Sequence, residues 1–148
     1  MRIVLDTSVL ISAIRSESGG AAEIVRLALT GKITLLMDLK IASEYRDVAL
    51  RAAHVRASGK SRRQVERLVQ LLEEVAEAVR VAFKHRPLSQ DVGDDMILDV
   101  AINGRAAAIV TNNVKHFADV AAAFGIRALG PKDFLDFYRK KGVSDGST

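Results

Sequence analysis

The sequence predicts an α/β fold in which a parallel sheet carries helices on both faces. Short apolar, β-like runs alternate with helical stretches along almost the whole chain. Strands that are separated by helices pair in parallel, because the crossover between them places a helix on the sheet. The 148 residues suit one domain, and no repeat, linker or change in composition divides them.

Five strands are expected from the apolar runs, and the run at 107–111 is typical of an interior strand. The predicted strands are residues 2–5, 33–37, 81–83, 107–111 and 126–129. The helices between them follow from apolar residues at helical spacing. They are residues 8–15, 21–30, 42–55, 61–79, 93–103, 117–124 and 131–141.

Local signals support several of these helix ends. Gly31 follows the second helix, where a left-handed residue commonly ends a helix. Ser61 and Gln64 have the spacing of a capping box, and Pro131 suits a first helical turn. Residues 142–148 are polar, so we expect a domain over residues 1–141 followed by a disordered tail.

Composition excludes several classes of protein. Hydrophobic residues make up 49% of the chain and charged residues 27%, as in an ordinary globular protein. Without cysteine there are no disulfides and no thiolate metal sites, which fits a reducing compartment. Asp6 interrupts the only apolar run near the N-terminus, so neither a signal peptide nor a membrane span is indicated. We therefore expect a cytoplasmic protein.

The positive charge is concentrated in residues 51–67. This stretch carries a net charge of +5, so the rest of the chain sums to −1. A charge run is most often a solvated helix face, but such a patch can also hold a polyanion through its phosphates. No aromatic side chain falls here to stack on bases. The predicted RNA contacts are Arg56, Lys60, Arg62 and Arg63.

Acidic residues recur where strands should end. Asp6 follows the first strand directly, and it could equally cap the next helix or project from the carboxyl edge of the sheet. Glu44 lies early in the predicted helix 42–55, where a favourable helix-dipole contact is the ordinary explanation. Asp95 and Asp99 share one face of the helix 93–103, and their repulsion would be relieved by a cation.

The polar groups at this edge offer oxygen ligands. Ser8, Thr111 and Asn113 add hydroxyl and amide oxygens beside the acids. Such a set suits Mg²⁺ or Mn²⁺ rather than zinc, and the three histidines have no metal-ligand spacing. There is no phosphate-binding glycine loop and no G-x-S-x-G elbow, which argues against an NTPase and a serine hydrolase.

Four segments together resemble the motifs of PIN domains. They are LDTSVLISA at 5–13, SEYRDV at 43–48, GDDMILDVA at 93–101 and IVTNNVKHF at 109–117. Each is modest alone, but four in order at family-like spacing are specific, and the likeness runs from about residue 2 to 138. The nearest branch is the VapC-like toxin group of type II toxin–antitoxin systems.

The resemblance implies a three-layer fold with a five-stranded parallel sheet and a Mg²⁺- or Mn²⁺-dependent ribonuclease. It further implies a homodimer and control by a cognate antitoxin. Asp6, Glu44 and Asp95 match the principal acids, and Asp99 a supporting one. Asn113 stands where many members have a fourth aspartate, which removes one negative charge.

We expect Asp6 and Asp95 to bind the ion directly, with Glu44 binding through water or acting as base. Ser8 and Thr111 would orient these groups. By resemblance, the products carry 5′-phosphate and 3′-hydroxyl ends.

Two rivals remain open. The first is a PIN-fold RNA-binding or assembly module with weak or no activity, and Asn113 supports it. A phosphatase or receiver domain with Asp6 as nucleophile is disfavoured, because a haloacid-dehalogenase-like enzyme would have a second aspartate where Ser8 stands.

Overall fold

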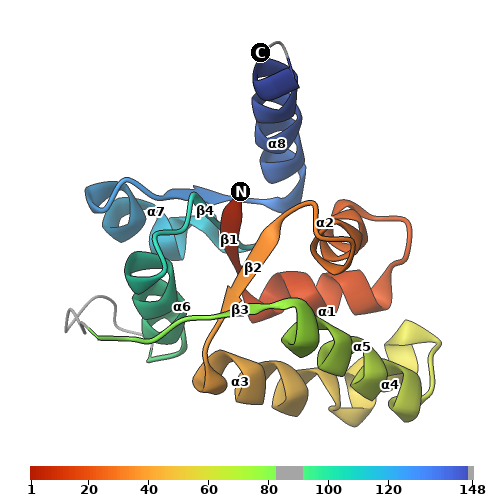
Figure 1. Ribbon diagram of the computed structural model, residues 1–148. Coiled ribbons are helices and arrows are strands. Elements are labelled where there is room, and N and C mark those ends of the chain that lie inside the picture. The colour runs from red at the N-terminus through yellow and green to blue at the C-terminus, as the bar shows by residue number, and fades with distance from the viewer. Residues whose placement is uncertain (83–91, 147–148) are drawn as a thin grey trace.

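The computed structural model of the chain describes residues 1–82 and 92–146 (Figure 1). Its strands are β1 (Arg2–Leu5), β2 (Thr34–Met37), β3 (Glu77–Ala78), β4 (Ala108–Val110) and β5 (Arg127–Leu129). Its helices are α1 (Thr7–Arg15), α2 (Gly20–Leu29), α3 (Leu39–Ala49), α4 (Ala52–Ser58), α5 (Arg62–Val75), α6 (Val92–Asn103), α7 (Val114–Ala123) and α8 (Pro131–Gly146).

The strands form one parallel sheet in the order β3-β2-β1-β4-β5. Helices α1 and α2 lie on one side of it and α6 and α7 on the other, as Figure 1 shows. This confirms the predicted α/β class and its five-stranded parallel sheet. The central strand, β1, has β2 on one side and β4 on the other. The crevice between the carboxyl ends of β1 and β4 is therefore the topological switch point, where ligands bind in open sheets of this kind.

The core surrounds the two central strands. Ile3, Val4 and Leu5 of β1 are buried, as is every residue of β4. Continuous apolar runs of this kind are stable only where both faces of a strand are covered. Helices α1 and α2 cover one face with buried residues at helical spacing, and α6 packs against β1 from the other side. Asp6 therefore directly follows a strand that is packed in the core.

The single helix predicted at 42–55 is wrong, because the structure has two helices there. Helix α3 begins at Leu39, since Asp38 accepts a hydrogen bond from the Ile41 N–H and caps it. It ends at Ala49, and α4 begins after Arg51. At the break, the Arg62 guanidinium donates to the Leu50 carbonyl at 3.1 Å and satisfies a group that a continuous helix would have used.

The end of α5 also differs from the prediction. The capping box is confirmed: Gln64 N–H donates to Ser61 Oγ, and Ser61 N–H donates to Gln64 Oε1. The helix stops at Val75, however, and residues 77–78 pair with β2 as β3. The strand predicted at 81–83 is thus misplaced, and residue 83 lies outside the described part of the chain.

Other boundaries shift by a few residues. Helix α7 begins at Val114 instead of residue 117, and α8 begins at Pro131 as predicted. Helix α8 continues to Gly146, although the sequence predicted a tail from residue 142; residues 147–148 lie outside the description. Among the described residues, no helix has both the length and the apolar character needed to cross a membrane.

Candidate active site

Asp6 lies at the switch point between β1 and β4. Its backbone N–H donates to the Val110 carbonyl at 2.9 Å and so extends the pairing of the two strands. Its Oδ2 atom accepts two hydrogen bonds, from Ser8 Oγ at 2.8 Å and from Thr111 Oγ1 at 2.7 Å. Although Asp6 occupies the cap position of α1, its side chain makes no capping hydrogen bond. The capping explanation of Asp6 is therefore wrong.

Asp38 provides a direct comparison, because it follows β2 as Asp6 follows β1. Its Oδ1 accepts from the Ile41 N–H at 2.9 Å, so Asp38 does cap its helix. Asp38 was not among the predicted site residues, although it shows the same signal as Asp6, an acid directly after an apolar strand. Two aspartates in matching positions thus have different roles: Asp38 caps the start of α3, and Asp6 is held by two hydroxyls at the sheet edge.

Backbone amides orient the two hydroxyls that hold Asp6. The Asn113 N–H donates to Thr111 Oγ1 at 2.9 Å, and the Asn112 N–H donates to Ser8 Oγ at 3.2 Å. Because each hydroxyl accepts from an amide, its single proton is directed to the Asp6 carboxylate. Ser8 and Thr111 thus both contact Asp6, and their predicted role in orienting a metal ligand stays a prediction.

Glu44 joins this edge from α3. Since α3 begins at Leu39, Glu44 lies in the middle of the helix, and a helix-dipole contact in the first turn no longer explains it. Its Oε2 accepts a hydrogen bond of 2.7 Å from Thr7 Oγ1. Thr7 directly follows Asp6, so this contact fixes the Glu44 carboxylate beside the start of α1.

Tyr45 lies beneath the two acids and was missed by the sequence analysis. It is fully buried, and its hydroxyl donates to the Leu5 carbonyl, one residue before Asp6. Burial, followed by the negative charges of Asp6, Glu44 and Asp38, raises the pKa of Tyr45 far above its usual range. The hydroxyl therefore stays protonated and remains a donor. A buried tyrosine needs such a partner, and its place next to Glu44 was the available signal.

Two acids of α6, Asp95 and Asp99, are buried. Asp95 is 6% exposed and Asp99 is 4% exposed, and they lie one turn apart as expected from their spacing. Like charges at this spacing on a helix repel each other, and a cation between them would relieve that repulsion. Asp94 lies elsewhere, with its Oδ2 3.4 Å from His116 Nδ1 on α7.

The donor chemistry of these residues fits a hard divalent ion, because it consists of carboxylate and hydroxyl oxygens. The Thr7–Glu44 and Tyr45–Leu5 hydrogen bonds hold α3 against the residues on either side of Asp6, and α6, the helix that carries Asp95 and Asp99, packs against β1. In the described part of the chain, no three Asp, Glu, His or Cys side chains form a group that could hold a metal ion. The ligand set of Asp6, Glu44 and Asp95 therefore stays a prediction.

Asn113 is exposed at the start of α7, and its side chain makes no capping hydrogen bond there. Its neighbour Asn112, which the sequence analysis passed over, is the better connected of the two. Asn112 Nδ2 donates to the Ser8 carbonyl at 3.2 Å and to Ser12 Oγ at 3.0 Å. Only the sequence motif therefore assigns Asn113 a role.

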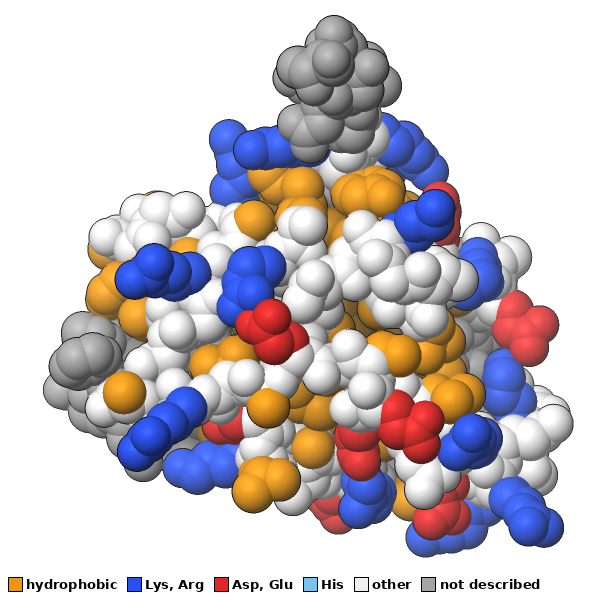
Figure 2. Space-filling view, in the orientation of Figure 1, with side chains coloured by type: hydrophobic (Ala, Val, Ile, Leu, Met, Phe, Trp, Pro, Cys, Tyr) orange, Lys and Arg blue, Asp and Glu red, His pale blue; other side chains and the backbone are white. Residues whose placement is uncertain are grey.

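The predicted RNA contacts divide into two kinds. Lys60 pairs with Glu17 at 3.0 Å and Arg62 donates to the Leu50 carbonyl, so both have structural partners. Arg56 and Arg63 form no ion pair with any described residue. Figure 2 shows blue and red side chains interspersed at the lower right, over α4 and α5, so this surface is mixed in charge.

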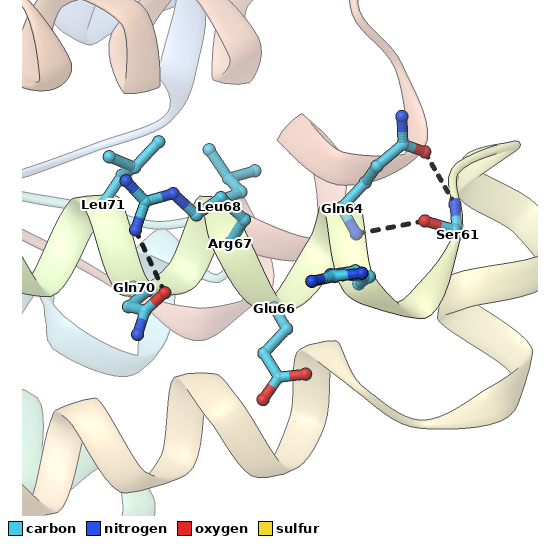
Figure 3. Close-up of a pocket in the computed structure, with 8 residues that line it drawn as sticks. Ser61, Gln64, Glu66, Arg67, Leu68, Gln70 and Leu71 are labelled. Atoms are coloured by element: carbon cyan, nitrogen blue, oxygen red, sulfur yellow. Dashed lines mark hydrogen bonds between the residues drawn. The ribbon is translucent and has the colours of Figure 1, made fainter.

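A surface hollow lies along the outer side of α5, close to this basic stretch (Figure 3). Arg63 and Leu68 are among its lining residues, and Arg67 donates to Gln70 Oε1 across it at 3.1 Å. None of the predicted acids lines it, so the hollow is separate from the site at the switch point.

Comparison with known proteins places the chain in a family. No curated protein matches it. The family model described as PIN domain matches residues 2–115, which is most of the chain and includes β1 through the start of α7. PIN domains are generally nucleases that hydrolyse nucleic-acid phosphodiesters, and they typically use divalent metal ions. The matched segment contains four of the five strands of the parallel sheet together with Asp6, Glu44, Asp95 and Thr111, and the chain belongs to the PIN-domain family.

Proposed function

We propose that the protein is a metal-dependent endoribonuclease whose active site lies at the carboxyl ends of β1 and β4. The observation that supports this most is the use of Asp6. A carboxylate at the cap position of a helix makes no cap and instead accepts two oriented hydroxyl protons. Carboxylates that bind metal ions typically accept hydrogen bonds from neighbouring side chains in this way.

In this proposal Asp6 and Asp95 hold Mg²⁺ or Mn²⁺ directly, and Glu44 binds it through water or acts as base. Asp99 supports Asp95, and Asn113 occupies the place of a fourth acid. When bound, the ion neutralises a phosphate oxygen and lowers the pKa of a water molecule. Thr7 keeps Glu44 turned towards the start of α1. Ser8 and Thr111 hold Asp6 in one orientation, so that less reorganisation is needed when the anionic substrate arrives.

The biological role we propose is that of the toxin in a type II toxin–antitoxin pair, as a homodimer restrained by a cognate antitoxin. This rests on the likeness of the four motifs to the VapC-like group. An adjacent reading frame for a small antitoxin-like protein would support it, and co-purification of that protein with this chain would test it.

Cleavage of a single-stranded RNA by the purified chain tests the enzymatic proposal. We expect cleavage with Mg²⁺ or Mn²⁺, none with EDTA, and products with 5′-phosphate ends. Asp6→Asn should abolish it. Asp38→Asn is the matched control: it makes the same charge change at the same sheet edge, and asparagine caps a helix as well as aspartate does. Equal loss in both variants would mean that the assay reports folding instead of the site.

A second candidate is an inactive PIN module that binds RNA or a protein. Two observations favour it: Asn113 in place of an acid, and the lack of a ready three-ligand group among the described residues. A Mn²⁺ titration by calorimetry separates the candidates, because a module without activity need not bind the ion.

A further inference from the structure

Asn112 ties the end of β4 to the start of α1. Its Nδ2 group donates to two acceptors on α1, the Ser8 carbonyl and Ser12 Oγ, across about one hundred residues of chain. Ser12 Oγ in turn donates to the Ser8 carbonyl at 3.2 Å, which closes a small ring of hydrogen bonds. The backbone N–H of Asn112 adds a contact to Ser8 Oγ. One residue therefore fixes both the backbone and the hydroxyl of Ser8.

This ring is connected to the carboxylate of Asp6 through Ser8. The Ser8 hydroxyl donates a hydrogen bond to Asp6 Oδ2, and the hydroxyl of Thr111, the residue before Asn112, does the same. Both donors converge on Oδ2, and none of the described residues donates to Oδ1. The orientation of the Asp6 carboxylate thus depends on the distance between α1 and the end of β4, which Asn112 spans.

We propose that Asn112 is a positioning residue that sets how Asp6 presents Oδ1 to the divalent ion. By holding Ser8 against the end of β4, it keeps both hydrogen bonds directed to Oδ2 and leaves the other oxygen for the ion. This proposal rests on the proposed metal site, and it assigns a role to a residue outside the four acids and Asn113.

The exposure of Asn112 makes the proposal testable apart from stability. An exposed hydrogen bond adds little to folding, so Asn112→Ala should change the melting temperature by no more than about 4 °C. The loss of a residue behind a metal ligand, in contrast, lowers affinity by about 10- to 100-fold. We therefore expect Asn112→Ala to bind Mn²⁺ at least about tenfold more weakly by calorimetry or electron paramagnetic resonance.

A second variant separates positioning from simple electrostatics. Asn112→Asp keeps the shape but replaces the Nδ2 donor with an oxygen, and it adds a negative charge near the ion. Electrostatics alone predicts tighter binding of a cation. Positioning predicts weaker binding, because a carboxylate cannot donate to the Ser8 carbonyl or hold the ring together.

Arg2→Lys is the matched control at the opposite edge of the sheet. Arg2 also ties distant segments, donating through Nε and Nη2 to the Gly104 carbonyl at 3.0 and 2.8 Å. Lysine keeps the charge but loses the paired contact, so stability should fall while Mn²⁺ affinity stays unchanged.

The decisive measurement is Mn²⁺ affinity in the wild type, Asn112→Ala, Asn112→Asp and Arg2→Lys. Weaker binding in both Asn112 variants, with wild-type affinity in Arg2→Lys, supports the inference. If the wild type binds Mn²⁺ and either Asn112 variant binds it equally or more tightly, the inference is overturned and the proposed function stands. If the wild type binds no Mn²⁺, the proposed function falls, and the positioning role falls with it.

Discussion

Thr111 Oγ1 donates a 2.7 Å hydrogen bond to Asp6 Oδ2, and this bond joins the residues that directly follow the two central strands, β4 and β1, and lie 105 positions apart in sequence. Thr111 is completely buried, and it accepts the Asn113 N–H while it donates to Asp6. The hydroxyl therefore has one acceptor available for its proton. This relationship makes Thr111 a sensitive place to test the site.

Thr111→Val removes this hydroxyl and preserves the shape of the side chain. Asp6 Oδ2 keeps only Ser8 as donor, so we expect Mn²⁺ affinity to fall by about 10- to 100-fold. The Asn113 N–H also loses its acceptor, which should cost about 1–3 kcal/mol of stability. Calorimetry and thermal unfolding measure the two effects. Thr111→Ser should restore affinity, and wild-type binding by the valine variant would remove Thr111 from the site.

Asp95→Asn should abolish RNA cleavage while the fold stays intact or becomes more stable. Asp95 and Asp99 are both buried and one turn apart, so neutralising one of them lowers their repulsion. We expect the cleavage rate to fall by more than about 100-fold, since even residues behind a metal ligand reach that loss. Asp119→Asn, an exposed change on α7, serves as the control. Cleavage by Asp95→Asn at the wild-type rate would show that the assigned site is wrong.

Mg²⁺ or Mn²⁺ should raise the melting temperature, because the ion binds the folded acids and not the unfolded chain. At one hundred times the dissociation constant, binding adds about 2.7 kcal/mol. For a chain of this size, this corresponds to roughly 5–10 °C. Differential scanning calorimetry with and without Mn²⁺ measures the shift, and Asp6→Ala should lose it. We expect no special preference for Zn²⁺. The absence of a shift at millimolar Mn²⁺ would favour the inactive-module candidate.

Asn113→Asp should strengthen metal binding by restoring the charge of the fourth acid. The affinity of hard cations rises with the charge of their ligands, so calorimetry should find a lower dissociation constant for Mn²⁺. Asn113 is exposed at the cap position of α7, where an aspartate also favours the helix. A rise in stability without a change in affinity would therefore place Asn113 away from the ion.

Arg56 and Arg63 are the cations of the basic stretch that we expect to hold RNA, because Lys60 and Arg62 already have protein partners. Each phosphate contact contributes about 0.7 to the log–log dependence of binding on salt for a single strand. The double change Arg56→Ala and Arg63→Ala should thus lower the slope by about 1.4 and weaken binding to all sequences alike. Lys132→Ala with Lys140→Ala on α8 makes the same charge change elsewhere. An unchanged slope would assign the α4–α5 surface to solvent or to a protein partner.

The sequence by itself determined the fold class and the edge of the sheet that carries the acids. Both follow from local patterns. The apolar runs of β1 and β4 specify buried parallel strands, and residues that follow such strands must lie at their carboxyl ends. The capping box of Ser61 and Gln64 was readable for the same reason, because its partners are three positions apart.

Tertiary structure decided what local pattern does not encode. Residues 77–78 are a strand because β2 offers them hydrogen bonds, although their neighbours continue a helical pattern. Asp6 and Asp38 each follow an apolar strand. Asp6 accepts hydrogen bonds from Thr111 and Ser8, whereas Asp38 caps the start of α3. The roles of Tyr45 and Asn112 likewise depend on partners far away in the chain. Contacts of this kind form only when the sheet assembles, because the closing of long loops, and not local periodicity, brings their atoms within hydrogen-bonding distance.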